Sequence, residues 1–174
     1  ELAAGKEAQG EQNGINSGFV LCIRNGFTIS FIIMKQEENK TVSVIIPTRN
    51  GASTLGALFA MLARQSVPLL EILVVDSSSE DESATIAREN GAQVTVINAA
   101  DFDHGGTRAM VAERAEGNIL VFFTQDAVPV DEDAVAKLIE PLSEEKKVAV
   151  CYGRQLPAAD ATPFAAHLRF FNYP

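Results

Sequence analysis

From Thr41 onward, short apolar runs alternate with longer segments of helical periodicity. Such alternation is typical of repeated βαβ units, whose strands lie parallel in one sheet. The runs are nearly continuous in apolar residues, as expected for strands that helices cover on both faces. The sequence therefore predicts an α/β fold, a Rossmann-like αβα sandwich with a mainly parallel sheet. The predicted strands are Val42–Ile46, Glu71–Val75, Gln93–Ile97, Asn118–Phe123 and Lys147–Tyr152, and the predicted helices are Ser53–Gln65, Glu80–Asn90, Gly106–Glu116 and Asp131–Leu142.

Size and composition limit the number of domains and the classes of ligand. With 174 residues, 47% of them hydrophobic, the chain can build one covered sheet but not a second full domain. Its formal charge of −9 argues against nucleic acid as a partner, because most of the surface repels a phosphate backbone. Cys22 and Cys151 lie far apart and form no CxxC pair, so we expect neither a zinc framework nor a disulfide scaffold. A reducing cytoplasm is the expected location.

The N-terminal part differs from the rest of the chain. Residues 1–17 are rich in Gly, Gln, Glu and Ala and are predicted to be a disordered leader. Residues 18–40 are predicted to be an accessory hairpin and linker, because Asn25-Gly26 stands between the β-rich runs Phe19–Ile23 and Phe27–Ile33. Polar residues interrupt this segment well short of a membrane span, and it lacks the basic start of a secretory signal. The functional domain is expected to cover residues 41–174.

Polar residues follow the first four predicted strands. In an open parallel sheet, ligands bind beyond the carboxyl ends of the strands, near the point where the strand order reverses. Four segments that are far apart in sequence should therefore deliver polar groups to one rim. The candidate ligand-binding residues are Pro47, Thr48, Arg49 and Asn50 after the first strand, Asp76 and Ser78 after the second, His104, Gly105, Gly106 and Arg108 after the third, and Gln125 and Asp126 after the fourth.

Several of these residues suit a nucleoside diphosphate, and each has a structural alternative. Asp76 can accept hydrogen bonds from a base or a ribose hydroxyl, or it can form a capping turn with the serines that follow it. Gly105 and Gly106 allow a phosphate to approach a helix start, but a tight loop also explains two glycines. Arg108 adds a positive charge beside them, although it also fits an exposed helix position. His104 can bind a phosphate oxygen or order the loop.

Asp126 is the most informative of the candidates. It follows a buried apolar strand, where packing gives no reason for a carboxylate. Mg²⁺ and Mn²⁺ often use only one or two protein carboxylates, with water and substrate phosphates completing the coordination. Asp126 is therefore a candidate ligand for Mg²⁺ or Mn²⁺, and the alternative is a turn aspartate before Pro129.

The same segments resemble the family 2 glycosyltransferases of the GT-A fold, and within them the bacterial rhamnosyltransferase-like branch. The resemblance covers roughly residues 41–174 and is carried by VSVIIPTRN (42–50), ILVVDSSSEDES (72–83), DFDHGGTR (101–108), VFFTQDA (121–127) and YGRQLP (152–157). It implies inverting transfer of a sugar, with a deoxyhexose such as rhamnose favoured, from a nucleoside-diphosphate-sugar donor to a glycan or lipid-linked acceptor in cell-envelope polysaccharide biosynthesis. It also allows peripheral association with the inner face of the membrane.

Two departures from the family pattern bear on the site. The family commonly carries Asp-x-Asp at the metal strand, whereas this chain has Thr124-Gln125-Asp126, which leaves Asp126 as the clear carboxylate. The family's catalytic base is an Asp or Glu in a later segment and is expected beyond Pro174. The resemblance thus implies a donor-binding half, in which Asp126 with its metal and Arg108 stabilise the departing diphosphate.

Other functional classes fit the residues less well. The first turn, PTRNGAS, lacks the GxGxxG of dinucleotide-binding enzymes, and the chain has no GxxxxGK[ST] of P-loop nucleotidases. A receiver domain would place acidic residues after the first strand, where Thr48, Arg49 and Asn50 stand. A non-catalytic sugar-nucleotide-binding or interaction module remains the alternative. The aromatic-rich end of the chain, with Phe164, Phe170, Phe171 and Tyr173, is expected to need cover, either from residues beyond this sequence or from another subunit such as a second copy of the chain.

Overall fold

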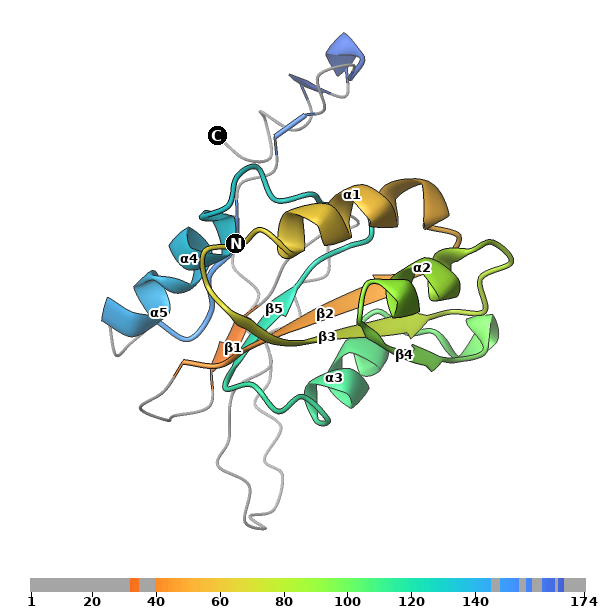
Figure 1. The fold of residues 1–174 in the computed structure, drawn as a ribbon, viewed down its shortest axis with the longest axis horizontal. Coiled ribbons are helices and arrows are strands. Elements are labelled where there is room, and N and C mark those ends of the chain that lie inside the picture. The colour runs from red at the N-terminus through yellow and green to blue at the C-terminus, as the bar shows by residue number, and fades with distance from the viewer. Residues whose placement is uncertain are drawn as a thin grey trace, which may run out of the picture.

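A computed structural model describes residues 32–34, 40–144, 148–153, 156–157, 161–164 and 166–167. Its centre is a five-stranded sheet with the order β1-β5-β2-β3-β4 (Figure 1). Four neighbouring strands are parallel, and β1 pairs antiparallel with β5 at one edge. The predicted α/β fold with a mainly parallel sheet is therefore confirmed. The strands are β1 (Ile32–Met34), β2 (Val42–Thr48), β3 (Leu69–Asp76), β4 (Gln93–Val96) and β5 (Ile119–Phe122).

Helices cover both faces of the sheet, and Figure 1 shows α1 above the strands and α3 below them. The helices are α1 (Ala52–Leu62), α2 (Ser83–Glu89), α3 (Gly106–Ala112), α4 (Ala134–Ile139) and α5 (Pro141–Glu144), with a short 3-10 helix, η1 (Ala99–Asp101). Residues of α1, α2, α4 and α5 share one hydrophobic cluster, and α3 belongs to a second cluster. The side chains of β2 alternate between the two clusters, because successive residues of a strand point to opposite faces.

The larger cluster holds α1 against the centre of the sheet. Leu55, Leu58 and Leu62 follow helical spacing and are fully or almost fully buried against Val44 and Ile46 of β2. Burying a leucine side chain stabilises the fold by about 1.5–3 kcal/mol. This packing fixes the first turn of α1, and therefore the loop from Thr48 to Gly51, at the carboxyl end of β2.

Two elements differ from the sequence-based prediction. Residues 148–152 form no strand, so the predicted strand Lys147–Tyr152 is wrong over that described part. The edge of β5 on which a further strand could pair is occupied by Ile32–Met34. The predicted helix Asp131–Leu142 is two short helices, because Pro141 has no N–H to continue the hydrogen bonding of α4 and instead begins α5.

The N-terminal predictions are only partly covered by the structure. The predicted leader and the strand Phe19–Ile23 lie outside the described residues, and of Phe27–Ile33 only the last two residues lie within them. These two residues belong to β1, so the end of the predicted accessory segment is a strand of the main sheet. Among the described residues, none of the helices has the length and apolar character needed to span a bilayer.

Strand order defines the position of the candidate site. Along the chain, β2, β3 and β4 follow one another toward one edge, whereas β5 lies on the opposite side of β2. The order therefore reverses between β2 and β5, and ligands of open parallel sheets bind beyond the carboxyl ends of the two strands at such a point. The loops after Thr48 and after Phe122 meet here.

Candidate functional site

The side chain of Gln125 joins the two loops at the reversal point. Its Oε1 accepts hydrogen bonds from the Thr48 hydroxyl at 2.7 Å and from the Arg49 N–H at 2.8 Å. Its Nε2 donates to the Arg49 carbonyl at 3.2 Å. One carboxamide thus forms hydrogen bonds with both backbone groups of Arg49 and with the hydroxyl of Thr48. Thr48 is a buried residue, only 4% exposed. We call this set of contacts the Gln125 clamp.

Gly51 has no side chain, and the Gln125 clamp occupies the space that a Cβ would need. A Cβ at this position would lie 2.7 Å from Gln125 Oε1 and 2.7 Å from Thr48 Oγ1, well inside van der Waals contact. The backbone of Gly51, at φ −102° and ψ 11°, is accessible to any residue. Close packing against Gln125 and Thr48 therefore accounts for the glycine, rather than backbone conformation.

Side chains of the β3–α2 loop hold the start of α1. The N–H groups of Asn50, Gly51 and Ala52 donate to Ser79 Oγ (2.9 Å), Ser83 Oγ (2.7 Å) and Asp81 Oδ2 (3.0 Å). In return, Asn50 Oδ1 accepts the N–H of Glu80 at 2.9 Å. Asn50 has a positive φ of 51°, a conformation that asparagine tolerates better than most residues. The first N–H groups of α1 are therefore engaged by protein side chains.

Asp81 caps two helices at once. In addition to Ala52 N, it accepts hydrogen bonds from the hydroxyl and the N–H of Ser83 at the start of α2. The Ser83 hydroxyl, followed by the Ala52 N–H, holds the pKa of the Asp81 carboxyl below its ordinary value of 3.8. The carboxylate is thus the stable form, as expected for an acceptor at helix N-termini.

Asp76 takes the turn-forming role that the sequence left open. It is 2% exposed, and its carboxylate accepts hydrogen bonds from the N–H of Ser79, at 3.0 Å, and from the Ser79 hydroxyl. Ser79 Oγ also accepts the Asn50 N–H, so Asp76 is linked through one hydroxyl to the β2–α1 loop. Ser78 is exposed with φ 53°, and its hydroxyl donates to the Ile97 carbonyl at 2.8 Å.

The loop before α3 is ordered by its own residues. Asp103 accepts the Gly106 N–H through its carboxylate, and its N–H donates to the Thr107 hydroxyl at 3.1 Å. The N–H of Gly106 that the sequence offered to a phosphate therefore has a carboxylate partner. Arg108 Nη1 donates to the His104 carbonyl at 2.8 Å, and the His104 ring lies edge-on to Phe102 with centroids 5.0 Å apart. Gly105 precedes the first turn.

Asp126 stands exposed immediately after the Gln125 clamp. The Thr124 hydroxyl donates to Asp126 Oδ1 at 2.6 Å, in a turn closed by the Ala127 N–H and the Thr124 carbonyl. Within the described ranges, no group of three or more His, Cys, Asp or Glu side chains could hold a metal ion. Asp126 supplies a carboxylate at this strand end, which fits a hard cation that takes its other ligands from water and phosphate oxygens.

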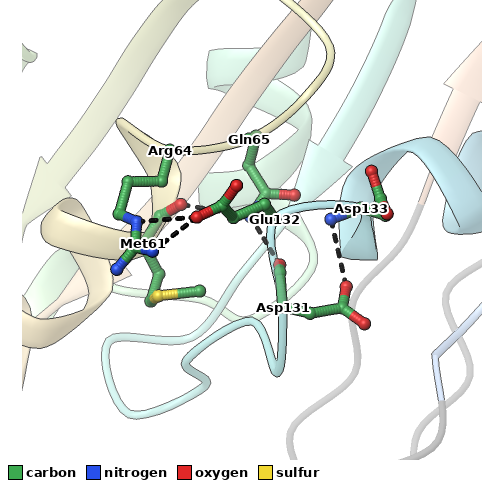
Figure 2. A network of polar contacts seen from close by, with 6 residues as sticks. All are labelled: Met61, Arg64, Gln65, Asp131, Glu132 and Asp133. Carbon is green, nitrogen blue, oxygen red and sulfur yellow. Dashed lines mark hydrogen bonds and ion pairs between the residues drawn. The ribbon is translucent and has the colours of Figure 1, made fainter.

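A second polar network fixes the segment that follows Asp126. Figure 2 shows Arg64 and Gln65, at the end of α1, directed toward Glu132 and Asp131. Arg64 Nε donates to Glu132 Oε1 at 3.0 Å, and Gln65 Nε2 donates to the Asp131 carbonyl at 2.9 Å. Gln65 Oε1 also accepts the Val135 N–H at 2.9 Å, so this network sets where α4 begins.

The structure brings some of the predicted site residues together and adds others. Thr48, Arg49 and Gln125 are in direct contact, and Asn50 is joined to Asp76 through Ser79. Pro47 is the buried residue before Thr48 in β2. The residues not predicted for the site are Ser79, Asp81 and Ser83, whose alternate spacing in a polar stretch between a strand and a helix is the signal that could have identified them.

Comparisons with known proteins assign the family. The model of Glycosyl transferase family 2 matches residues 43–174. The O-antigen chain rhamnosyltransferase RfbN of Salmonella typhimurium is 38% identical over 134 residues, covering 76% of this chain and 42% of the relative. The O-antigen chain rhamnosyltransferase WbaN of Salmonella anatum is 36% identical over 133 residues, covering 75% and 42%. The chain thus spans less than half the length of these relatives.

Solved structures agree with this assignment. The mannosyltransferase PcManGT of Pyrobaculum calidifontis, determined in complex with GDP-Man and Mn²⁺, has a TM-score of 0.50 and 26% identity, over 59% of this chain and 32% of that one. Glucosyl-3-phosphoglycerate synthase of Mycobacterium tuberculosis has a similar fold, with a TM-score of 0.51 and 23% identity over 62% and 41% of the two chains. The family model covers most of this chain, and the two rhamnosyltransferases are 38% and 36% identical to it over three quarters of its length, so the chain belongs to glycosyl transferase family 2.

Proposed function

We propose that the chain forms the donor-binding part of an inverting glycosyltransferase, which transfers a sugar from a nucleoside-diphosphate-sugar to an acceptor hydroxyl. The observation that carries this proposal is the junction of two loops at the reversal of strand order. There the Gln125 clamp fixes the backbone of Arg49, and the next residue presents an exposed carboxylate. Membership of the family and the named activities of the relatives support it.

Asp126 is proposed to hold the donor diphosphate through Mg²⁺ or Mn²⁺. Its exposed carboxylate supplies one hard oxygen ligand, and the hydrogen bond from Thr124 orients that carboxylate. A bound divalent cation would stabilise the negative charge that develops on the departing diphosphate. The presence of Mn²⁺ in the solved PcManGT complex supports a metal in this role.

The roles of the other candidate residues at the carboxyl ends of the strands are proposed from how exposed they are. Arg49, Asn50, Ser78 and His104 are exposed at the loops beyond β2, β3 and β4, and can contact the nucleoside. Asp76 is buried and acts by ordering the loop that carries Asn50. This arrangement differs from the direct base contact considered from the sequence.

The donor loop before α3 is proposed to change its contacts when a diphosphate binds. Gly105, Gly106 and Arg108 lie near one another, but the Gly106 N–H contacts Asp103 and Arg108 contacts the His104 carbonyl. If a phosphate drew Arg108 away from this carbonyl, it would gain a charge-assisted hydrogen bond from the positively charged guanidinium.

The proposed donor sugar and acceptor are inferred from the names of the two Salmonella relatives. Both Salmonella relatives are named O-antigen chain rhamnosyltransferases, which supports rhamnose as the sugar and a cell-envelope glycan or its lipid-linked form as the acceptor. The cytoplasmic location, association with the inner face of the membrane and homodimer expected from the sequence stay predictions.

Calorimetry with a panel of nucleotides tests the proposal. With Mn²⁺ present, the chain should bind at least one of dTDP, UDP and GDP at micromolar to millimolar concentration, and it should bind NAD at least tenfold more weakly. Failure to bind any nucleoside diphosphate would refute the donor site. A transfer assay with a nucleoside-diphosphate-rhamnose, made on a chain extended beyond Pro174 to include the expected base, then separates the two interpretations. A glycosyltransferase would release nucleoside diphosphate as it transfers the sugar, whereas a non-catalytic binding module would bind the donor and release none.

A further inference from the structure

The carboxamide of Gln125 makes three hydrogen bonds to Thr48 and Arg49. Its carboxamide has one acceptor and one donor atom, and both are directed at the Thr48–Arg49 segment. Oε1 accepts two hydrogen bonds and Nε2 donates one, so three of the four hydrogen bonds that the carboxamide can form order the Thr48–Arg49 segment. The sequence placed Gln125 among the candidate nucleotide-binding residues, and the structure shows that its carboxamide joins the loops that follow β2 and β5.

The residues on either side of the Gln125 clamp carry the proposed binding groups. On the β5 side, Asp126 follows Gln125 directly in the chain. On the β2 side, Arg49 and Asn50 follow Thr48, and Asn50 is held in turn by Ser79 and Glu80. Gln125 therefore connects two segments that are 76 residues apart in sequence and that must keep a fixed separation to hold the two ends of one donor.

We infer that Gln125 is a positioning residue: its carboxamide sets the nucleoside-binding loop of Arg49 and Asn50 relative to Asp126, and it does not itself contact the donor. This inference rests on the proposed function for its consequence, but the Gln125 clamp can be measured without any ligand. Preorganisation of this kind strengthens binding because the loop loses no further conformational freedom when the donor binds.

Gln125→Met removes the clamp and keeps the length of the side chain. Amide exchange followed by NMR should show the Arg49 N–H of the unliganded chain exchanging at least about tenfold faster in this variant, because its acceptor is gone. The affinity for UDP or dTDP with Mn²⁺, measured by calorimetry, should fall about tenfold, as expected when hydrogen bonds that order a loop are lost.

Glu71→Met is the matched control at the other end of the sheet. The Glu71 carboxylate accepts hydrogen bonds from the Ser43 hydroxyl, the Glu116 N–H and the Gln93 amide, so this variant loses as many contacts as Gln125→Met. It should lower the melting temperature but leave the affinity for the nucleoside diphosphate within about twofold of the unmodified chain. An equal loss of affinity in both variants would mean that Gln125 acts through general stability, and would overturn the inference.

Thr48→Val distinguishes positioning from direct contact and serves also if Gln125→Met does not fold. It removes one donor to the Gln125 clamp from the loop side, so it should speed Arg49 exchange and weaken binding in the same direction. The double variant should bind no more than about twofold more weakly than Gln125→Met alone. If the two effects multiply in full, Gln125 and Thr48 contact the donor independently and the inference is wrong.

The two proposals fail in different ways. Unchanged Arg49 exchange in Gln125→Met would refute the Gln125 clamp itself, whatever the chain binds. Faster exchange of the Arg49 N–H with an unchanged affinity for the nucleoside diphosphate would refute the role of Gln125 in positioning the nucleoside-binding loop of Arg49 and Asn50. Absence of nucleoside diphosphate binding by the unmodified chain would refute the proposed function, and with it the donor-related part of this inference, while the exchange result would still stand.

Discussion

Replacing Gly51 by alanine should destabilise the protein through one identifiable group, the Gln125 carboxamide. The new Cβ would lie 2.7 Å from Gln125 Oε1 and 2.8 Å from Gln125 Cδ, so the carboxamide must move and its hydrogen bonds must break. The bonds to the exposed backbone of Arg49 are replaced by water at small cost. Thr48 is 4% exposed as a residue, and its hydroxyl loses its acceptor, which costs about 1–3 kcal/mol.

The net effect should be about 1–1.5 kcal/mol of lost stability, since alanine at an allowed backbone conformation returns about 0.4–1 kcal/mol of the cost by restricting the unfolded chain. A double-mutant cycle measured by urea unfolding isolates the cause. In a Gln125→Ala background the cost of Gly51→Ala should fall by at least about 1 kcal/mol, because only the contact with Thr48 remains. If the two substitutions are additive within about 0.5 kcal/mol, the close packing of Gly51 against Gln125 is not what the glycine serves.

Three further results are expected. Gly117→Ala would place a Cβ 2.5 Å from Ser43 Oγ and 2.7 Å from its backbone N, and urea unfolding should show a loss of about 2 kcal/mol; a loss below about 0.5 kcal/mol would contradict this contact. Leu58→Ala, in a fully buried position of α1, should cost about 2–5 kcal/mol by the same assay, and an effect typical of a surface site would show that the α1 interface is wrong. Because the pKa of Asp81 is lowered in the folded protein, its contribution to stability is present above its unfolded pKa near 3.8 and is lost as pH falls through the lower folded value. The melting temperature should therefore decline less steeply from pH 5 to 2.5 in Asp81→Asn than in the unmodified chain. Equal slopes would argue against the hydrogen bonds of Asp81 at the starts of both helices.

The parallel sheet could be predicted from the sequence because each of its strands is a nearly continuous apolar run. A strand covered on both faces is mostly apolar. β5 is entirely apolar, and β2 is buried over its whole length with Ser43 and Thr48 as its polar residues. The rim could also be predicted, since polar residues follow these strands directly. Periodicity says nothing, however, about which strand lies at an edge, and so the pairing of Ile32–Met34 with β5 was not predicted.

The contacts within the rim could not be predicted for a related reason. Gln125 meets Arg49 across 76 residues of sequence, and Asp81 meets Ala52 across 29. Hydrogen bonds between loops depend on the register of the strands below them, which local patterns do not encode. The sequence therefore identified Gln125 and Asp76 as candidates, and only the fold shows that the Gln125 side chain contacts the loop after β2 and that Ser79 links the Asp76 carboxylate to Asn50.

The most direct test of the donor site is the metal dependence of nucleoside diphosphate binding. Calorimetric titrations of UDP or dTDP should be made without metal and with Mn²⁺, on the unmodified chain, Asp126→Asn and the control Asp133→Asn. Asp133 is an exposed carboxylate further along the same segment, so its variant makes the same change of charge. We expect Mn²⁺ to strengthen nucleoside diphosphate binding at least tenfold in the unmodified chain and in Asp133→Asn, and to have no effect on binding by Asp126→Asn. Equal dependence on Mn²⁺ in all three proteins would contradict the assignment of the diphosphate to Asp126.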